Sequence, residues 1–93
     1  MNNWKKEWLE KNGFKWVSDN SYIYEFDDFE LEVRIADNGM YTANVIPNAT
    51  WEFASFQQFK TPKEAVVHAI EAHKELEKII REENEKLEAV QFV

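Results

Sequence analysis

Apolar and polar residues alternate on both sides of a turn in the middle of this chain, which limits the folds open to it. In residues 29–45, FELEVRIADNGMYTANV, every second residue is apolar up to Ile35, and the alternation resumes at Tyr41. The pattern is typical of two half-buried antiparallel strands joined by a hairpin. One face should be apolar, and the other should carry Glu30, Glu32, Arg34, Thr42 and Asn44.

The register of this hairpin follows from keeping each face of one kind. A two-residue Asn38-Gly39 loop would place Val33 opposite Asn44, whereas a loop of Asp37, Asn38 and Gly39 places it opposite Ala43. A slip of one residue would turn every side chain to the other face, so we predict the three-residue loop, with Gly39 in the left-handed region. The three-residue loop also predicts the pairs Ile35–Tyr41, Leu31–Val45, Glu32–Asn44 and Arg34–Thr42.

The alternation extends to both sides of this hairpin. Residues 22–26, YIYEF, form a strand that a two-residue Asp27-Asp28 loop joins to Phe29, which pairs Tyr24 with Leu31 and Glu25 with Glu30. Phe14 and Trp16 begin the pattern, and Trp51 and Phe53 continue its apolar face as a further strand. We predict an antiparallel meander of four or five strands over residues 14–56.

A helix is expected at each end of the sheet. Trp4, Trp8 and Leu9 share one helical face ahead of Gly13, which predicts a helix over residues 3–12. Thr61, Pro62 and Glu64 form an N-cap, a first-turn proline and a capping box, so a second helix should run from residue 62 to residue 88. Its buried stripe would consist of Val66, Ala69, Ile70, His73, Leu76 and Ile80.

The C-terminal helix is expected to be longer than the sheet. About 27 residues span ~40 Å as a helix, whereas a seven-residue strand covers only ~23 Å. The helix end and the apolar tail, residues 89–93, would then project. The tail would fray, or it would bind a target, a groove on this domain, or a second copy of the chain. In the last case the oligomerisation residues would be Leu87, Val90, Phe92 and Val93.

Together these elements predict one α+β domain, residues 1–93, in two layers: the short N-terminal helix, the antiparallel meander, and the long C-terminal helix packed on one sheet face. Four Trp, three Tyr and seven Phe suffice for a modest core. The chain has no Cys for disulfide or thiolate chemistry. It shows no signal-peptide pattern and no stretch of ~20 apolar residues that would span a membrane, so we expect a cytoplasmic location.

The charge is concentrated in the middle of the chain. The net charge is -7, and residues 14–59 carry eight acidic residues against Lys15 and Arg34 alone. Such a surface would repel nucleic-acid phosphates and anionic membranes, so we expect neither as a direct partner. A partner protein with a basic surface is favoured instead.

No residue pattern points to catalysis, a cofactor or a metal. His68 and His73 are five residues apart, whereas two ligands on one helical face need a spacing of three or four. The chain has no Gly-rich phosphate loop and no nucleophile with a base in a known motif. The carboxylates lie on an expected open sheet face, which lacks the cleft that separates pKa values for acid–base work. We therefore expect a protein that is not an enzyme.

The acidic side of the sheet has two interpretations. It could serve solubility and protect the sheet edge. Alternatively, it could bind a partner, although like charges directly opposite each other destabilise a sheet. The candidate partner-binding residues are Glu25, Asp27, Asp28, Glu30, Glu32 and Asp37.

Two resemblances bear on function. Residues 56–70, FQQFKTPKEAVVHAI, resemble the strand-to-helix joint of many small β-α proteins, including HicB-like antitoxins, and the latter resemblance would imply an antitoxin-repressor role. In size, charge and lack of catalytic groups the whole chain resembles the small inhibitors that phages use against host defences. Our first hypothesis is a phage or mobile-element inhibitor that occupies a basic, nucleic-acid-binding site on a host enzyme. The alternatives are a homodimeric structural or antitoxin-like protein and a small-molecule-sequestering protein with a pocket between helix and sheet.

Overall fold

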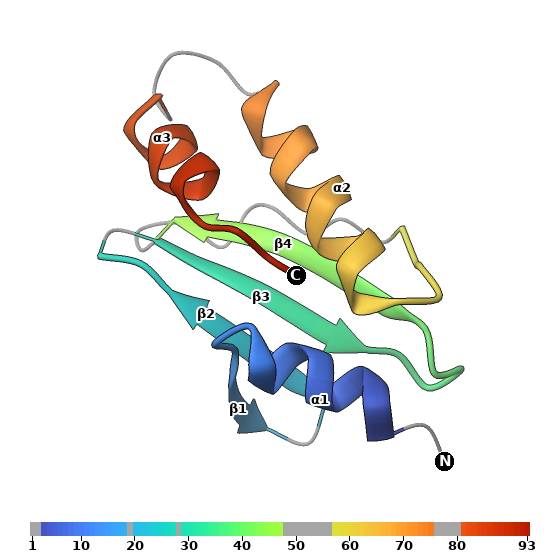
Figure 1. Cartoon of the computed structure of the whole chain (residues 1–93). Coiled ribbons are helices and arrows are strands. Elements are labelled where there is room, and N and C mark those ends of the chain that lie inside the picture. The colour runs from blue at the N-terminus through green and yellow to red at the C-terminus, as the bar shows by residue number, and fades with distance from the viewer. Residues whose placement is uncertain (1–2, 19, 28, 48–56, 76–80) are drawn as a thin grey trace.

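The computed structural model describes residues 3–18, 20–27, 29–47, 57–75 and 81–93. They form an α+β fold, as predicted, with the helices on one side of an antiparallel sheet (Figure 1). The described elements in chain order are α1 (Asn3–Lys11), β1 (Lys15–Ser18), β2 (Ser21–Glu25), β3 (Phe29–Ile35), β4 (Tyr41–Pro47), α2 (Pro62–Lys74) and α3 (Arg81–Ala89).

The sheet is a meander in which each strand pairs with the next, in the order β1-β2-β3-β4. Strands β3 and β4 have the predicted register, with Val33 opposite Ala43 and Ile35 opposite Tyr41. At the loop, the Gly39 N–H donates to the Ala36 carbonyl at 2.9 Å, and Gly39 has φ +82. The three-residue loop is therefore confirmed.

The register between β2 and β3 is also as predicted. Tyr24 lies opposite Leu31, Glu25 lies opposite Glu30, and the Phe26 N–H donates to the Phe29 carbonyl at 2.9 Å.

A fifth strand was expected at Trp51 and Phe53, which lie outside the described residues. Phe59, in the next described segment, forms an isolated antiparallel bridge with Tyr41. Their backbone groups exchange two hydrogen bonds, of 2.7 Å and 2.8 Å. Helix α2 thus begins directly beside β4.

The N-terminal end of α2 has the predicted cap. The Thr61 hydroxyl accepts from the Glu64 N–H at 3.2 Å and donates to the Glu64 carboxylate at 2.9 Å, while Pro62 occupies the first turn. An N-cap of this kind satisfies a donor that the helix itself cannot pair. Val66, Ala69 and His73 are buried on the predicted stripe.

The predicted helix from residue 62 to residue 88 is confirmed only in part, over Pro62–Lys74. Helix α2 ends at Lys74, and α3 is a separate helix of nine residues; Leu76 and Ile80 of the expected stripe lie outside the described residues. A straight helix would have carried Leu87 past the sheet, whereas in the folded chain Leu87 is only 2% exposed. Burying a leucine side chain contributes about 1.5–3 kcal/mol, which favours the separate, docked helix.

Helix α1 has nearly the predicted bounds, and Gly13 just past its end has φ +90, as expected. The Phe14 N–H reaches back to the Leu9 carbonyl at 2.9 Å, a hydrogen bond that closes the end of the helix.

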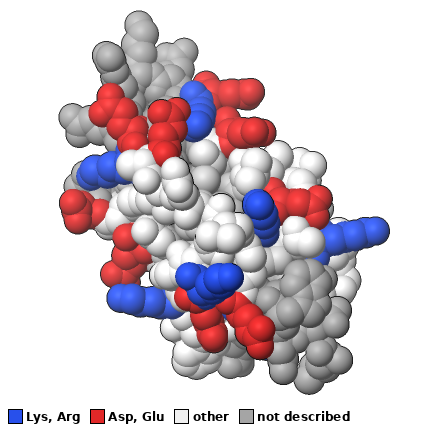
Figure 2. All heavy atoms as spheres, viewed as in Figure 1, with Lys and Arg blue, Asp and Glu red and all other residues white. Residues whose placement is uncertain are grey.

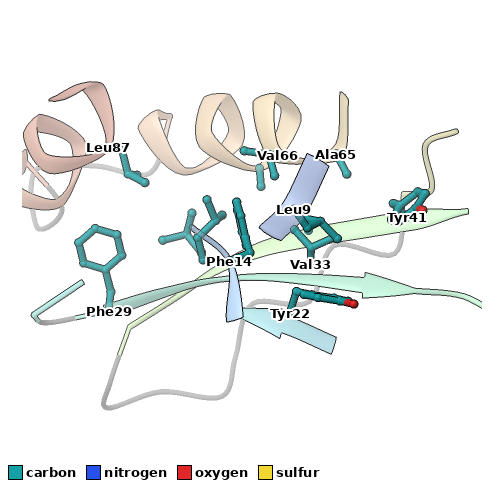
Figure 3. Packing of buried hydrophobic residues seen from close by; sticks show 13 residues of the cluster. Leu9, Phe14, Tyr22, Phe29, Val33, Tyr41, Ala65, Val66 and Leu87 are labelled. Atoms are coloured by element: carbon teal, nitrogen blue, oxygen red, sulfur yellow. The ribbon is translucent and has the colours of Figure 1, made fainter. Parts of the chain in front are cut away.

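The core lies between the helices and the sheet (Figure 3). Leu9 of α1, Val66 of α2 and Leu87 of α3 approach the apolar face of β2, β3 and β4. The His73 ring stacks on Phe29 with centroids 6.5 Å apart. In the part of the chain that the structure describes, every helix is too short and too polar to cross a membrane.

Candidate functional site

The sheet face turned away from the helices carries the polar residues that the alternation predicted. Along β3 the core residues Phe29, Leu31 and Val33 are buried, whereas Glu30 and Glu32 between them are half-buried. Because side chains alternate along a strand, both glutamates point away from the core.

Two acidic residues on this face, Glu25 of β2 and Glu30 of β3, lie directly opposite each other. Their neighbours Phe26 and Phe29 share a ladder hydrogen bond, so Glu25 and Glu30 form a pair without one. Side chains lie closest in pairs of that type. Residues 24–31, YEFDDFEL, contain four acidic residues and no basic one.

Glu32 differs from this pair because it has a cation beside it. The Arg34 Nε lies 3.0 Å from the Glu32 carboxylate, and the Glu32 side chain is only 13% exposed. A covered and paired carboxylate offers less to an incoming partner than the exposed Glu25. Glu32 therefore shares the sheet face with Glu30 but is less available to a partner than Glu25.

The remaining predicted partner-binding residues lie at two ends of the sheet. Asp27 is exposed in the β2–β3 turn, and Asp28 beside it lies outside the described residues. Asp37 is exposed in the β3–β4 loop, at the other end of the seven-residue strand β3. A strand of that length spans ~23 Å. The predicted residues thus do not form one patch, and we call Glu25, Asp27 and Glu30 the acidic hairpin end.

On the helix side, the described residues carry charges of both signs (Figure 2). Figure 2 shows Lys and Arg side chains interspersed with Asp and Glu around a central uncharged region. On this side of the molecule, the Lys74 Nζ of α2 lies 3.1 Å from the Glu88 carboxylate of α3.

The residues predicted for oligomerisation lie against their own domain. Leu87 is buried in the core, Val90 is half-buried, and Phe92 packs against the core cluster. Only Val93 has a largely exposed side chain. This arrangement matches the alternative in which the tail occupies a groove on its own domain, and a dimer stays a prediction.

The two histidines pack against aromatic rings, His68 on Phe59 at 5.0 Å and His73 on Phe29. Among the described residues, no group of three or more His, Cys, Asp or Glu could hold a metal ion.

Two buried tyrosines have perturbed ionisation. Burial raises the pKa of Tyr22, and the charge of Glu10 raises it further. Burial also raises the pKa of Tyr41, to which the proximity of Tyr22 adds. Both rings lie on the core side of the sheet, so they take no part in the acidic surface.

Sequence reasoning missed an exposed aromatic on the first strand. Trp16 pairs with Tyr22 and was expected on the apolar face, yet its side chain is 60% exposed. Val17 beside it is also exposed, and the register shifts between Trp16 and Ser18. Strand β1 lies at one edge of the four-stranded sheet. An alternating pattern says which face a residue takes but not whether that face is covered there.

No family model, curated protein or solved structure matches this chain. The function is therefore argued from its own residues.

Proposed function

We propose that this chain is a non-enzymatic binding module whose acidic hairpin end docks on a basic surface of a partner protein. The supporting observation is the Glu25–Glu30 pair, in which two carboxylates face each other across the strands. Such a pair destabilises a sheet, by up to about 1 kcal/mol relative to neutral residues. A partner's lysines or arginines between the two side chains would remove that repulsion on binding.

The proposed partner is a basic site that otherwise binds nucleic-acid phosphates, on a host defence enzyme opposed by a phage or mobile element. Carboxylates along a hairpin can take the place of phosphates in such a site because both bind lysine and arginine through charge-assisted hydrogen bonds. The net charge of -7 would also speed the encounter with a basic protein.

The test begins by capturing the target from a bacterial lysate and identifying it by mass spectrometry. Its affinity is then measured by calorimetry for the wild type, for Glu25→Lys with Glu30→Lys, and for Asp37→Lys as a charge reversal at the far end of β3. We expect the first variant to lose more than about tenfold in affinity, since each lost charge contact is worth roughly 1.5–3 kcal/mol. The Asp37 variant should lose little.

Folding has to be separated from binding in this experiment. The single change Glu30→Lys places opposite charges across the strands, so it should raise the free energy of unfolding by about 0.2–1 kcal/mol while it weakens binding. Unchanged affinity in the double reversal, or an equal loss in Asp37→Lys, would show that the acidic hairpin end is not the docking surface.

A second candidate is a homodimer, and the exposed edge strand is the observation in its favour. Trp16 and Val17 are large apolar residues on β1, a strand that pairs with β2 on one side. Exposed strand edges with apolar residues are templates for pairing with another chain. Sedimentation should then show a dimer that Trp16→Lys dissociates, and a monomer at all concentrations would remove this candidate.

A further inference from the structure

The segment after α3 returns across the helix side of the sheet toward α1 (Figure 1). Residues 90–93 belong to no helix or strand, yet they are attached to residues about eighty positions earlier in the chain. Their attachment consists of one aromatic side chain and one backbone unit.

Phe92 supplies the aromatic side chain. Its ring centroid lies 5.6 Å from that of Phe14, 5.6 Å from that of Tyr24 and 6.4 Å from that of Trp8. The Tyr24 ring meets it edge-on, at 80°. Pairs at such distances and angles are favourable beyond the area they bury. Three rings from α1, the segment after it and β2 therefore form a groove that accepts an aromatic residue.

Val93 supplies the backbone unit. Its N–H donates to the Asn12 side-chain oxygen at 2.7 Å, and the Trp8 indole N–H donates to its carbonyl oxygen. The Asn12 amide nitrogen in turn donates to the Trp8 carbonyl at 2.7 Å, which orients the amide oxygen toward Val93. Both polar groups of one peptide residue are thus bound by side chains, while the Val93 side chain is 67% exposed.

This combination distinguishes the groove from ordinary core packing. Buried contacts hold Phe92 through its side chain, but Val93 is held only through groups that every residue except proline possesses. Gln91, on the other side of Phe92, is exposed. The groove therefore selects an aromatic residue at one position and accepts almost any residue after it.

We propose that Trp8, Asn12, Phe14 and Tyr24 form a binding site for an extended peptide segment of a partner protein, with an aromatic residue followed by a residue held through its backbone. The chain's own Phe92 and Val93 occupy the site in the free protein and compete with the partner. A tethered competitor acts at an effective concentration in the millimolar range, so the site responds only to a tighter or locally concentrated segment.

The test uses the full chain with Phe92→Ala and, as probe, the acetylated peptide EAVQFV, the sequence of residues 88–93. Binding is followed by NMR through the Trp8 indole N–H. The peptide should bind this variant saturably, and EAVQAV should bind at least about tenfold more weakly because it lacks the ring contacts. The wild type should bind EAVQFV at least about tenfold more weakly than the variant, since its own tail competes.

Two controls confine the result to the groove. Asn12→Ala added to Phe92→Ala should weaken the peptide further, whereas Trp16→Ala added to it should not, because Trp16 lies on the sheet edge. If Phe92→Ala fails to fold, Phe92→Leu keeps an apolar side chain in place, and the peptide should still displace the weaker leucine. A folded variant that does not bind EAVQFV, or that binds EAVQAV equally well, overturns the proposal.

Sedimentation of the wild type at the same concentrations addresses a second copy as the occupant. We expect a monomer. A dimer that Phe92→Ala abolishes would show that the tails exchange between copies, which would overturn the assignment to a partner protein.

Discussion

Two glycines have the only positive φ angles among the described residues, and they differ in what surrounds them. A side chain at Gly39 would meet nothing within 4 Å. A Cβ at Gly13 would lie 3.1 Å from the Tyr24 ring, which is itself held between Phe14 and Phe92. One position therefore needs glycine only for its backbone, and the other needs it also for space.

Substitution of each glycine by alanine should separate these two needs. Gly39→Ala should lower the free energy of unfolding by about 1–2 kcal/mol, the cost of the left-handed region for an L residue. Gly13→Ala should cost more, because the same backbone strain is joined by a clash that Tyr24 cannot easily relieve. Urea denaturation gives both values, and an equal or reversed order would contradict the packing of Tyr24 around Gly13.

At this scale the sequence was most informative where two requirements coincide. The place of Gly39 in a three-residue loop was predicted by the alternation on both sides and by the turn that glycine permits. Both requirements led to the observed register. Trp16 satisfied only the alternation, which cannot say whether a helix covers that position. The contact between Arg34 and Glu32 was equally out of reach, since side-chain conformers two residues apart on one strand face depend on the surroundings.

Among the elements, the two ends of α2 differ in how well local sequence signals predict them. The start of α2 is marked by three residues with defined capping roles, and it was predicted to the residue. Its end has no such marker, because no Gly or Pro follows Pro62 and REENEKLE favours helix throughout. Leu87 of α3 packs in the core, a contact between distant segments that no local pattern contains.

The attachment of α3 should depend on its leucine far more than on its ion pair. Leu87→Ala should lower the free energy of unfolding by about 2–5 kcal/mol, the range for a buried leucine. Lys74→Ala breaks the contact with Glu88. The side chains of both residues are exposed, so this change should lower the free energy of unfolding by less than about 1 kcal/mol. Urea denaturation of the two variants tests this, and a larger loss for Lys74→Ala would mean that charge holds the helix.

For the whole molecule, the two sides of the sheet carry different kinds of residue. The helix side contains the core and the groove that Phe92 and Val93 occupy. The other side presents the acidic hairpin end. The sequence predicted which residues take each side, because alternation fixes sides. It did not predict the groove that binds the C-terminal residues, since Trp8, Asn12 and Phe92 meet only after the chain has folded back across the sheet.

The described helices and strands β2 to β4 share one core, so ionisation inside it should destabilise the fold as a whole, and Tyr22 and Tyr41 provide the test. Burial raises the pKa of both above the usual value of 10.0. Below pH 10 both the folded and the unfolded chain keep these protons, so the two tyrosines contribute no pH dependence to the free energy of unfolding there. As the pH rises past 10, the unfolded chain releases its tyrosine protons first, so the free energy of unfolding should fall until the folded pKa values are reached.

Urea denaturation between pH 8 and pH 11 measures this fall, with Tyr22→Phe compared at each pH with the wild type. Other groups titrate in the same range, but they are common to both proteins, so the difference between the two curves isolates Tyr22. The variant should lose less stability above pH 10, because it lacks one buried phenol and also removes the neighbour that raises the pKa of Tyr41. Parallel curves would mean that the Tyr22 hydroxyl is as accessible to ionisation in the folded chain as in the unfolded one.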